Sequence, residues 1–139
     1  MKNTILITAI AAAALSGCGM FNKSSDTAAP AKTASSPSTP TQTAEGVLIG
    51  PDGRTLYVFA QDVAGSGKSA CVDTCAVNWP PLTVTPTAQA LGDYSIVNRT
   101  DGTRQWAYKG MPLYYFIKDA NPGDRSGDGV GGNWRIARR

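Results

Sequence analysis

Two cysteines are the side chains in this sequence whose spacing most directly suggests chemistry. Cys71 and Cys75 stand four positions apart in "SACVDTCAVNWPPL". Such a pair can form a structural disulfide, act as a redox couple, or bind Cu(I) together with Met111. Two Cys alone do not complete a structural zinc site. Which of these roles the pair has depends on the redox conditions of the compartment to which the chain is exported.

The rest of the chain offers little for catalysis. It has no His, which removes the commonest general base and the commonest ligand of zinc, copper and haem. Paired carboxylates can do acid–base work without His, but the Asp residues stand in Asp-Gly turns and at strand ends, and the only Glu is Glu45. The sequence therefore predicts no catalytic residue and no cofactor.

Several oxygen ligands gather in the segment "DANPGDRSGDGVGG", where Asp119, Asn121, Asp124 and Asp128 stand close together. Such residues can bind calcium, but their spacing does not follow the EF-hand pattern. Gly and Asp are also the residues that tight turns require. We therefore expect a solvated loop and no metal site, with calcium binding as the open alternative.

The first residues have the pattern of an export signal. Lys2 is followed by an apolar run and small residues, too short for an ordinary membrane span. Residues 15–18, Leu-Ser-Gly-Cys, resemble the lipobox of bacterial lipoproteins. The resemblance implies that a signal peptide of residues 1–17 is removed and that Cys18 carries the lipid, with palmitate or a related acyl chain as membrane anchor.

The predicted export leads to two further expectations. Gly19 follows the lipidated Cys, where Asp would favour the inner membrane, so an outer membrane location facing the periplasm is favoured if the cell has two membranes. The periplasm is oxidising. A structural disulfide between Cys71 and Cys75 is therefore favoured over a redox or metal-binding pair.

Composition divides the mature chain into a tether and one small domain. Residues 18–45 are dominated by Ser, Thr, Ala and Pro and are predicted to be a disordered tether. Residues 46–139 are enough for one core. There, three Lys and seven Arg oppose eight Asp, a net charge of about +2, and the basic residues are scattered apart from the tail "RIARR". Nucleic-acid binding is therefore not expected.

Turn signals between short apolar runs predict a mainly β domain. Asp52-Gly53 separates "GVLIG" from "TLYVFA", and Asp101-Gly102 separates "YSIVNR" from "RQWAYK", as in hairpins. A third tight turn is predicted at Lys109-Gly110. We therefore expect a small antiparallel β domain with few or no helices.

The sequence also repeats itself. "GRTLYVFAQD" and "GMPLYYFIKD" share Gly, Leu, Tyr, Phe and Asp at matching places, and each is followed by a glycine-rich loop and by Asn-Trp. We therefore predict two tandem repeats related by a pseudo-two-fold axis. The repeat-motif residues, which are also the candidate binding residues, are Tyr57, Phe59, Asp62 and Trp79 in the first copy and Tyr114, Phe116, Asp119 and Trp134 in the second.

Alternation within each copy predicts where these side chains point. Tyr57 and Phe59 face one way while Leu56 and Val58 face the other, and two apolar faces favour a strand inside a sheet. Each motif Asp comes where its strand ends and is expected to accept backbone hydrogen bonds in the following turn. Both motif Trp should be core residues or anchors of the contact between the copies, both Phe should be core, and one or both Tyr hydroxyls should reach a polar partner at the domain edge.

These segments, with "CVDTCAVNWPPL" and "NPGDRSGDGVGGNW", resemble a bacterial family of predicted lipoproteins described as a secreted repeat with a Tyr-x-(Phe/Trp/Tyr)-x-x-Asp motif. The resemblance implies a lipoprotein or secreted protein of unknown role. Our leading hypothesis is a lipid-anchored, non-catalytic envelope module that offers an aromatic surface to another envelope protein or a small ligand. The alternatives are a redox or electron-transfer accessory acting through Cys71 and Cys75, and a purely structural or stress-protective protein. No oligomeric state is predicted.

Overall fold

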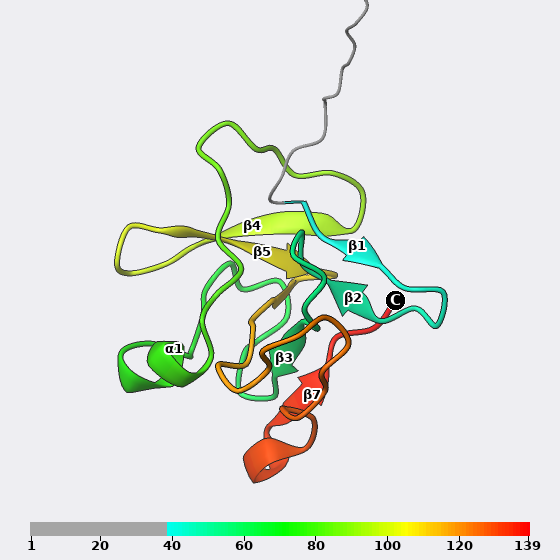
Figure 1. Cartoon of the computed structure of the whole chain (residues 1–139). Coiled ribbons are helices and arrows are strands. Elements are labelled where there is room, and N and C mark those ends of the chain that lie inside the picture. Colours follow the sequence, from blue (N-terminus) through cyan, green and yellow to red (C-terminus); the bar gives the residue numbers. More distant parts are fainter. Residues whose placement is uncertain (1–38) are drawn as a thin grey trace, which may run out of the picture. The chain divides into compact units, whose positions relative to one another are not determined.

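The computed structural model describes residues 39–139 of the chain. The predicted signal peptide, the lipid attachment at Cys18 and tether residues 18–38 lie outside the described residues. In the described part, strands outnumber helices. The elements in chain order are β1 (Thr41–Gln42), β2 (Leu48–Ile49), β3 (Tyr57–Phe59), α1 (Thr74–Asn78), β4 (Tyr94–Asn98), β5 (Arg104–Tyr108), β6 (Met111–Pro112), the 3-10 helix η2 (Val130–Gly132) and β7 (Trp134–Ile136) (Figure 1).

The strands form three small antiparallel sheets, with the orders β1-β2, β3-β7 and β4-β5-β6. β3 and β7 stand far apart in the sequence but run side by side in the structure (Figure 1). Isolated bridges join the sheets to neighbouring segments, among them Tyr57 with Tyr114 and Thr83 with Gln105. The predicted fold class, a small antiparallel β domain with few helices, is confirmed.

All three predicted turns are present. Gly50 N donates to Arg54 O at 3.0 Å across the first turn, and Arg99 N donates to Thr103 O at 2.9 Å across the second. The third turn joins β5 to β6 through Lys109-Gly110, whose φ angles are 48° and 83°. Two consecutive positive φ angles give a turn whose twist matches that of the flanking strands.

The repeated Tyr-x-Phe segments separate two layers of buried side chains. Tyr57 and Phe59 contribute to one layer, and Leu56, from the opposite face of the same segment, contributes to the other. The second copy is divided in the same way, as its alternation predicts. We call the layers the aromatic cluster (Tyr57, Phe59, Cys71, Trp79, Tyr114, Phe116 and Trp134) and the leucine cluster (Leu48, Leu56, Leu82, Trp106, Leu113, Tyr115 and Ala137).

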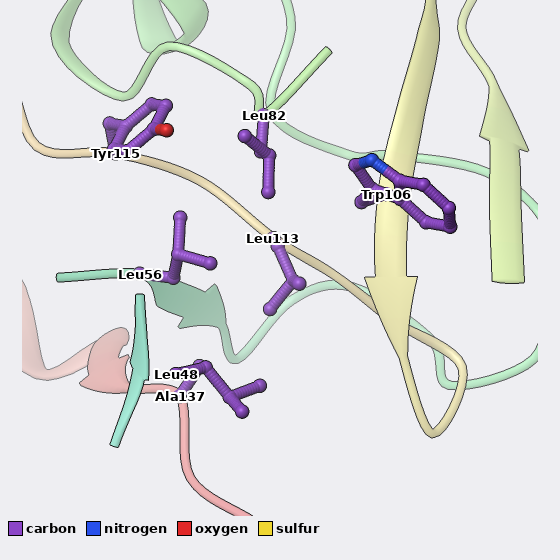
Figure 2. Close-up of a cluster of buried hydrophobic side chains, with 7 residues drawn as sticks. All are labelled: Leu48, Leu56, Leu82, Trp106, Leu113, Tyr115 and Ala137. Atoms are coloured by element: carbon purple, nitrogen blue, oxygen red, sulfur yellow. The ribbon is translucent and has the colours of Figure 1, made fainter. Parts of the chain in front are cut away.

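The leucine cluster draws its side chains from both copies of the repeat. Leu48, Leu56 and Leu82 come from the first copy, and Trp106 and Leu113 come from the second. Figure 2 shows these side chains gathered around Leu113. Neither copy therefore has a core of its own. The apolar surface of each copy is buried against the other, as expected for units too small to fold alone.

The folded region begins earlier than the sequence predicts. β1 lies inside the segment assigned to the tether and pairs with β2 as an antiparallel ladder. Thr43 closes the turn between them, because its N–H donates to Val47 O at 2.9 Å and its Oγ1 accepts from Val47 N at 3.3 Å. A Thr-containing edge strand has the composition of a tether, so composition alone places this boundary wrongly.

The substitution Phe59→Ala should lower the free energy of unfolding by about 3–5 kcal/mol, because loss of the ring leaves a cavity in the aromatic cluster. Phe59 is 8% exposed and stacks on Trp134. Denaturant unfolding followed by circular dichroism measures the change. The control Val77→Ala, at a side chain that is 63% exposed, should shift the same quantity by no more than about 0.5 kcal/mol. A Phe59→Ala protein as stable as the wild type would contradict a core role for the motif.

Candidate functional site

The motif residues of the two copies meet at one place in the fold. The two motif segments cross at Tyr57, in β3, and Tyr114, which follows β6 and forms an isolated bridge, and their backbones exchange two hydrogen bonds. Tyr57 N donates to Tyr114 O at 2.8 Å, and Tyr114 N donates to Tyr57 O at 3.0 Å. This exchange makes the crossing point symmetrical, with each copy contributing the same residue type to it.

Beyond the crossing, each motif strand pairs with the Asn-Trp segment of the other copy. Ala60 N donates to Asn133 O at 2.7 Å, and Ile117 N donates to Asn78 O at 3.0 Å. The first motif strand is thus completed by residues that follow the second motif, and the reverse also holds. The two copies are interlocked.

The motif Tyr and Asp side chains follow the same crossed scheme. The Tyr57 hydroxyl donates to Asp119 Oδ2 at 2.5 Å, and the Tyr114 hydroxyl donates to Asp62 Oδ2 at 2.7 Å. Each tyrosine therefore bonds the carboxylate of the other copy and not its own. A hydrogen bond to an ionised acceptor is about twice as strong as a neutral one.

The second oxygen of each carboxylate fastens the loop that follows its own strand. Asp62 Oδ1 accepts from Ala70 N at 2.6 Å, and Asp119 Oδ1 accepts from Ser126 N at 3.0 Å and from the Ser126 hydroxyl. These are the backbone hydrogen bonds that the sequence predicts for the two Asp residues. Each carboxylate thus joins a local loop to a distant strand.

Four aromatic rings form a continuous stack that is symmetrical about its centre. Trp79 and Trp134 lie face to face in the middle, with ring centroids 3.7 Å apart. Phe116 stacks on the outer side of Trp79 at 4.2 Å, and Phe59 on the outer side of Trp134 at 4.4 Å. Both motif Trp therefore anchor the contact between the copies, as predicted.

Burial of the motif corrects one part of the sequence-based hypothesis. All eight motif residues are buried, and the two tyrosines, Tyr57 and Tyr114, are 0% exposed. The Tyr hydroxyls do reach polar partners, but these lie inside the core and not at the domain edge. The motif therefore offers no aromatic surface, because its rings pack against one another inside the fold.

A buried cation stands beside one of the two Tyr–Asp pairs. Arg99 donates through Nη1 to Ser69 Oγ and to Gln105 Oε1, both at 2.8 Å, and through Nη2 to Cys71 O at 2.7 Å. The Ser69 hydroxyl lies 2.7 Å from the Tyr114 hydroxyl. A chain of polar groups therefore runs from Gln105 through Arg99 to the Tyr114–Asp62 pair.

Sequence analysis missed Arg99, Ser69 and Gln105. Arg99 precedes an Asp-Gly hairpin turn, a position where a solvated cation is the ordinary expectation. Ser69 stands in a glycine-rich loop. Only Gln105 carried a signal, since a polar side chain directly before Trp106 in a strand that is otherwise buried needs an internal partner.

Burial is the largest influence on the ionisable groups of this site. It raises the pKa of the Asp62 carboxyl, although Ala70 N–H, the Tyr114 hydroxyl and Arg99 act in the opposite direction. Burial likewise raises the pKa of the Tyr57 and Tyr114 hydroxyls, and the carboxylate that each one faces adds to the shift. The tyrosines therefore stay protonated and remain donors.

The predicted disulfide between Cys71 and Cys75 is present. Cys71 is fully buried in the aromatic cluster, and Cys75 lies in α1, whose end delivers Trp79 to the stack. Trp79 N donates to Cys75 O at 2.8 Å. The disulfide thus fixes the short segment that sets the position of one central ring.

The carboxylates of the Asp-rich segment bond protein groups of the segment itself and of neighbouring strands. Asp124 Oδ2 accepts from Ala120 N at 3.0 Å and from Asn121 N at 2.9 Å, and Asp128 Oδ1 accepts from Ile136 N at 3.1 Å. Asp119 is occupied by the Tyr57 pair. Among residues 39–139, no three His, Cys, Asp or Glu side chains are grouped so that they could hold a metal ion.

The geometry of this site suits cohesion better than reaction. Its hydroxyls and carboxylates bond one another inside the fold, and Asp62 also borders a surface hollow of about 300 Å³. No helix within residues 39–139 is long and apolar enough to cross a membrane. The arrangement joins two chain segments, and its chemistry is that of buried, charge-assisted hydrogen bonds.

The crossed pairing predicts a specific pattern of energetic coupling. Tyr57→Phe should lower the free energy of unfolding by about 1–3 kcal/mol, because the buried Asp119 carboxylate loses a donor. A double-mutant cycle of Tyr57→Phe with Asp119→Asn should show a coupling energy of about 0.5–3 kcal/mol. The matched cycle with Asp62→Asn, the carboxylate of the same copy, should be additive to within about 0.5 kcal/mol. Coupling to Asp62 alone would contradict the crossing.

Alkaline pH should unfold the domain as its buried tyrosines ionise. The pKa of Tyr57 and Tyr114 in the folded protein lies above the ordinary value of 10.0. Their contribution to the free energy of unfolding is therefore complete below pH 10. Above pH 10 the unfolded tyrosines ionise while the folded ones stay protonated, and stability falls as pH rises. The part of the tyrosinate absorbance that belongs to Tyr57 and Tyr114 should therefore appear together with the loss of circular dichroism. In the double variant Tyr57→Phe with Tyr114→Phe the pH dependence should weaken, and an unchanged profile would assign it to other groups.

Comparison with known proteins agrees with the division of the fold into two interlocked copies. A family model described as a secreted repeat of unknown function matches the chain twice, at residues 39–83 and 95–138. The first match begins just before β1, where the described fold also begins. No curated protein and no solved structure matches the chain. By its two repeats, this chain belongs to the family of secreted repeats of unknown function.

Proposed function

We propose that this protein is a lipid-anchored, non-catalytic module of the bacterial cell envelope that serves as a binding or structural component. The observation that carries the proposal is the crossed pairing of Tyr57 with Asp119 and of Tyr114 with Asp62. It accounts for the repeated motif as a device that folds two small units into one domain. The motif is then explained without substrate, cofactor or metal.

The state of the motif carboxylates supports the non-catalytic part of the proposal. The chain has no His, and the motif carboxylates, Asp62 and Asp119, are buried and bonded to protein donors. General acid–base catalysis needs a titratable group within hydrogen-bond reach of a substrate. A buried carboxylate with both oxygens occupied does not meet that condition.

The anchoring part of the proposal rests on the sequence of the export signal. Leu15, Ser16, Gly17 and Cys18 form the processing pattern of a lipoprotein. Two or three acyl chains at Cys18 hold a protein on a membrane for long periods, since each buried methylene adds about 0.8 kcal/mol. Gly19 favours the outer membrane, facing the periplasm, in a cell that has two membranes.

We assign the binding of an envelope protein or a small ligand to surfaces other than the motif rings, because those rings are buried. A surface hollow of about 490 Å³ lies beside the loop that precedes β4 and is lined by residues such as Leu91, Tyr94 and Trp106. None of the eight motif residues lines it. We therefore assign recognition to the loops and outer faces, and cohesion to the motif.

The disulfide fits a structural role better than the redox alternative. Cys71 is 0% exposed, and a redox couple needs a thiolate that its partner can attack. The chain-entropy model gives about 2 kcal/mol for so small a ring. Periplasmic protein whose Cys71 and Cys75 both alkylate readily without added reductant would favour the redox accessory instead.

The lipid anchor is tested by the substitution Cys18→Ala. The variant should leave the membrane fraction, and labelled palmitate should mark the wild type alone, because the acyl chains supply the membrane affinity. Fractionation and fluorography measure both results. The control Cys71→Ala with Cys75→Ala should keep both the label and the membrane location. Unchanged membrane association of Cys18→Ala would refute lipid anchoring and leave the account of the motif intact.

A further inference from the structure

The contacts between the motif residues of the two copies are reciprocal. We call residues 39–83 the first half and residues 95–138 the second half, after the two matches of the repeat family. Each half gives a Tyr hydroxyl and receives one, and each gives one ring to the central Trp pair. Each half also completes the motif strand of the other. The surface that one half presents is therefore complementary to the surface of the other half, whichever chain carries it.

Only the linker of residues 84–94 joins the halves covalently in the described part of the chain. The disulfide between Cys71 and Cys75 closes a ring inside the first half. The linker, the green loop that leads into β4 in Figure 1, contains no helix or strand before Tyr94. Arg104 holds it through Nη1 to Pro86 O at 2.9 Å and Nη2 to Ala88 O at 3.2 Å. The two halves can therefore move apart on the intact linker without breaking a covalent bond.

We propose that a second copy of this chain is a binding partner of the first through exchange of halves. The first half of one copy docks on the second half of the other, and the converse contact forms at the same time. The exchanged pair has two complete cores, each with both Tyr–Asp bonds and a Trp79–Trp134 stack. The exchanged pair has the same contacts between halves as two closed chains, and only the path of the linker from one half to the other differs.

The linker decides between the closed chain and the exchanged pair. A short flexible linker holds its two ends at an effective concentration in the millimolar range. The closed chain therefore dominates in dilute solution. Exchange becomes favourable when the protein concentration approaches that range, or when the linker is too short to let both halves of one chain meet.

The structure shows how short the linker can become before the chain fails to close. Thr83, the last residue of the first half, bridges Gln105 on one edge of β5, and Ser95, the first residue of the second half, pairs with Ala107 on the opposite edge. Two residues along the strand and two inter-strand steps separate Thr83 from Ser95 by roughly 12 Å in a straight line, and a connection has to pass over the face of the strand. Deletion of residues 84–92 leaves two residues between them, which span at most about 11 Å. The shortened chain cannot close on itself.

The first test measures the mass of the chain from Gly19 to Arg139 with and without this deletion. Light scattering at micromolar concentration should give a folded monomer for the natural linker and twice that mass for the shortened one. The matched control replaces residues 84–92 by nine Gly and Ser residues and should return the mass to that of a monomer. A shortened chain that is folded and monomeric would overturn the proposal.

The second test works whether or not each variant folds alone. One chain carries Trp79→Ala and the other Trp134→Ala, so neither can form the Trp pair by itself. An exchanged pair of the two chains brings an intact first half to an intact second half and restores one stack. Its near-ultraviolet circular dichroism should reappear after the two are refolded together, in the shortened background at micromolar concentration and with the natural linker at about 1 mM.

The comparison for this test is the average of the two variants refolded separately. A gain over that average, with the Trp signature of the wild type, supports exchange of halves. No gain in either linker background overturns it. The double variant Trp79→Ala with Trp134→Ala, mixed with either single variant, should give no gain, because no such mixture supplies both intact halves.

Discussion

Two buried carboxylates set the condition on which this domain folds. An ionised Asp is costly to bury unless it is hydrogen-bonded. Asp62 and Asp119 each find one set of donors in the following loop and the other donor, a Tyr hydroxyl, in the opposite half of the chain. Neither half can satisfy its carboxylate alone. The crossing of the motif segments and the stack of rings also need residues from both halves. The halves therefore fold together or not at all.

This crossing also explains how so small a domain obtains a core. A unit of about 45 residues rarely buries enough apolar surface to fold alone. Each motif strand here is apolar on both faces, and the crossing places both faces of both strands against other parts of the chain. Tyr57 lies in the aromatic cluster while its neighbour Leu56 lies in the leucine cluster. The same short motif therefore serves two layers.

Local chemistry made much of this predictable. Period-two alternation predicts the division of Tyr57 and Leu56 between layers, and Asp-Gly pairs predict the turns, because both depend only on neighbours in the chain. The partner that each motif side chain bonds does not depend on its neighbours in the chain. Nothing in the order of residues decides that Tyr57 bonds Asp119 and not Asp62, since that follows from how two strands cross. The expected aromatic surface was wrong for the same reason: the rings of each copy are covered by the other copy.

The two copies reach one crossing by different loop chemistry. Arg99 and a disulfide support the loop after Asp62, whereas the Ser126 backbone and hydroxyl bond Asp119 directly. What the copies share is buried and occupied by folding, and what distinguishes them lies in their loops. The motif Tyr and Asp side chains of both copies are taken up by the contact between them. The motif therefore accounts for the cohesion of the domain, and the loops account for the differences between its two copies.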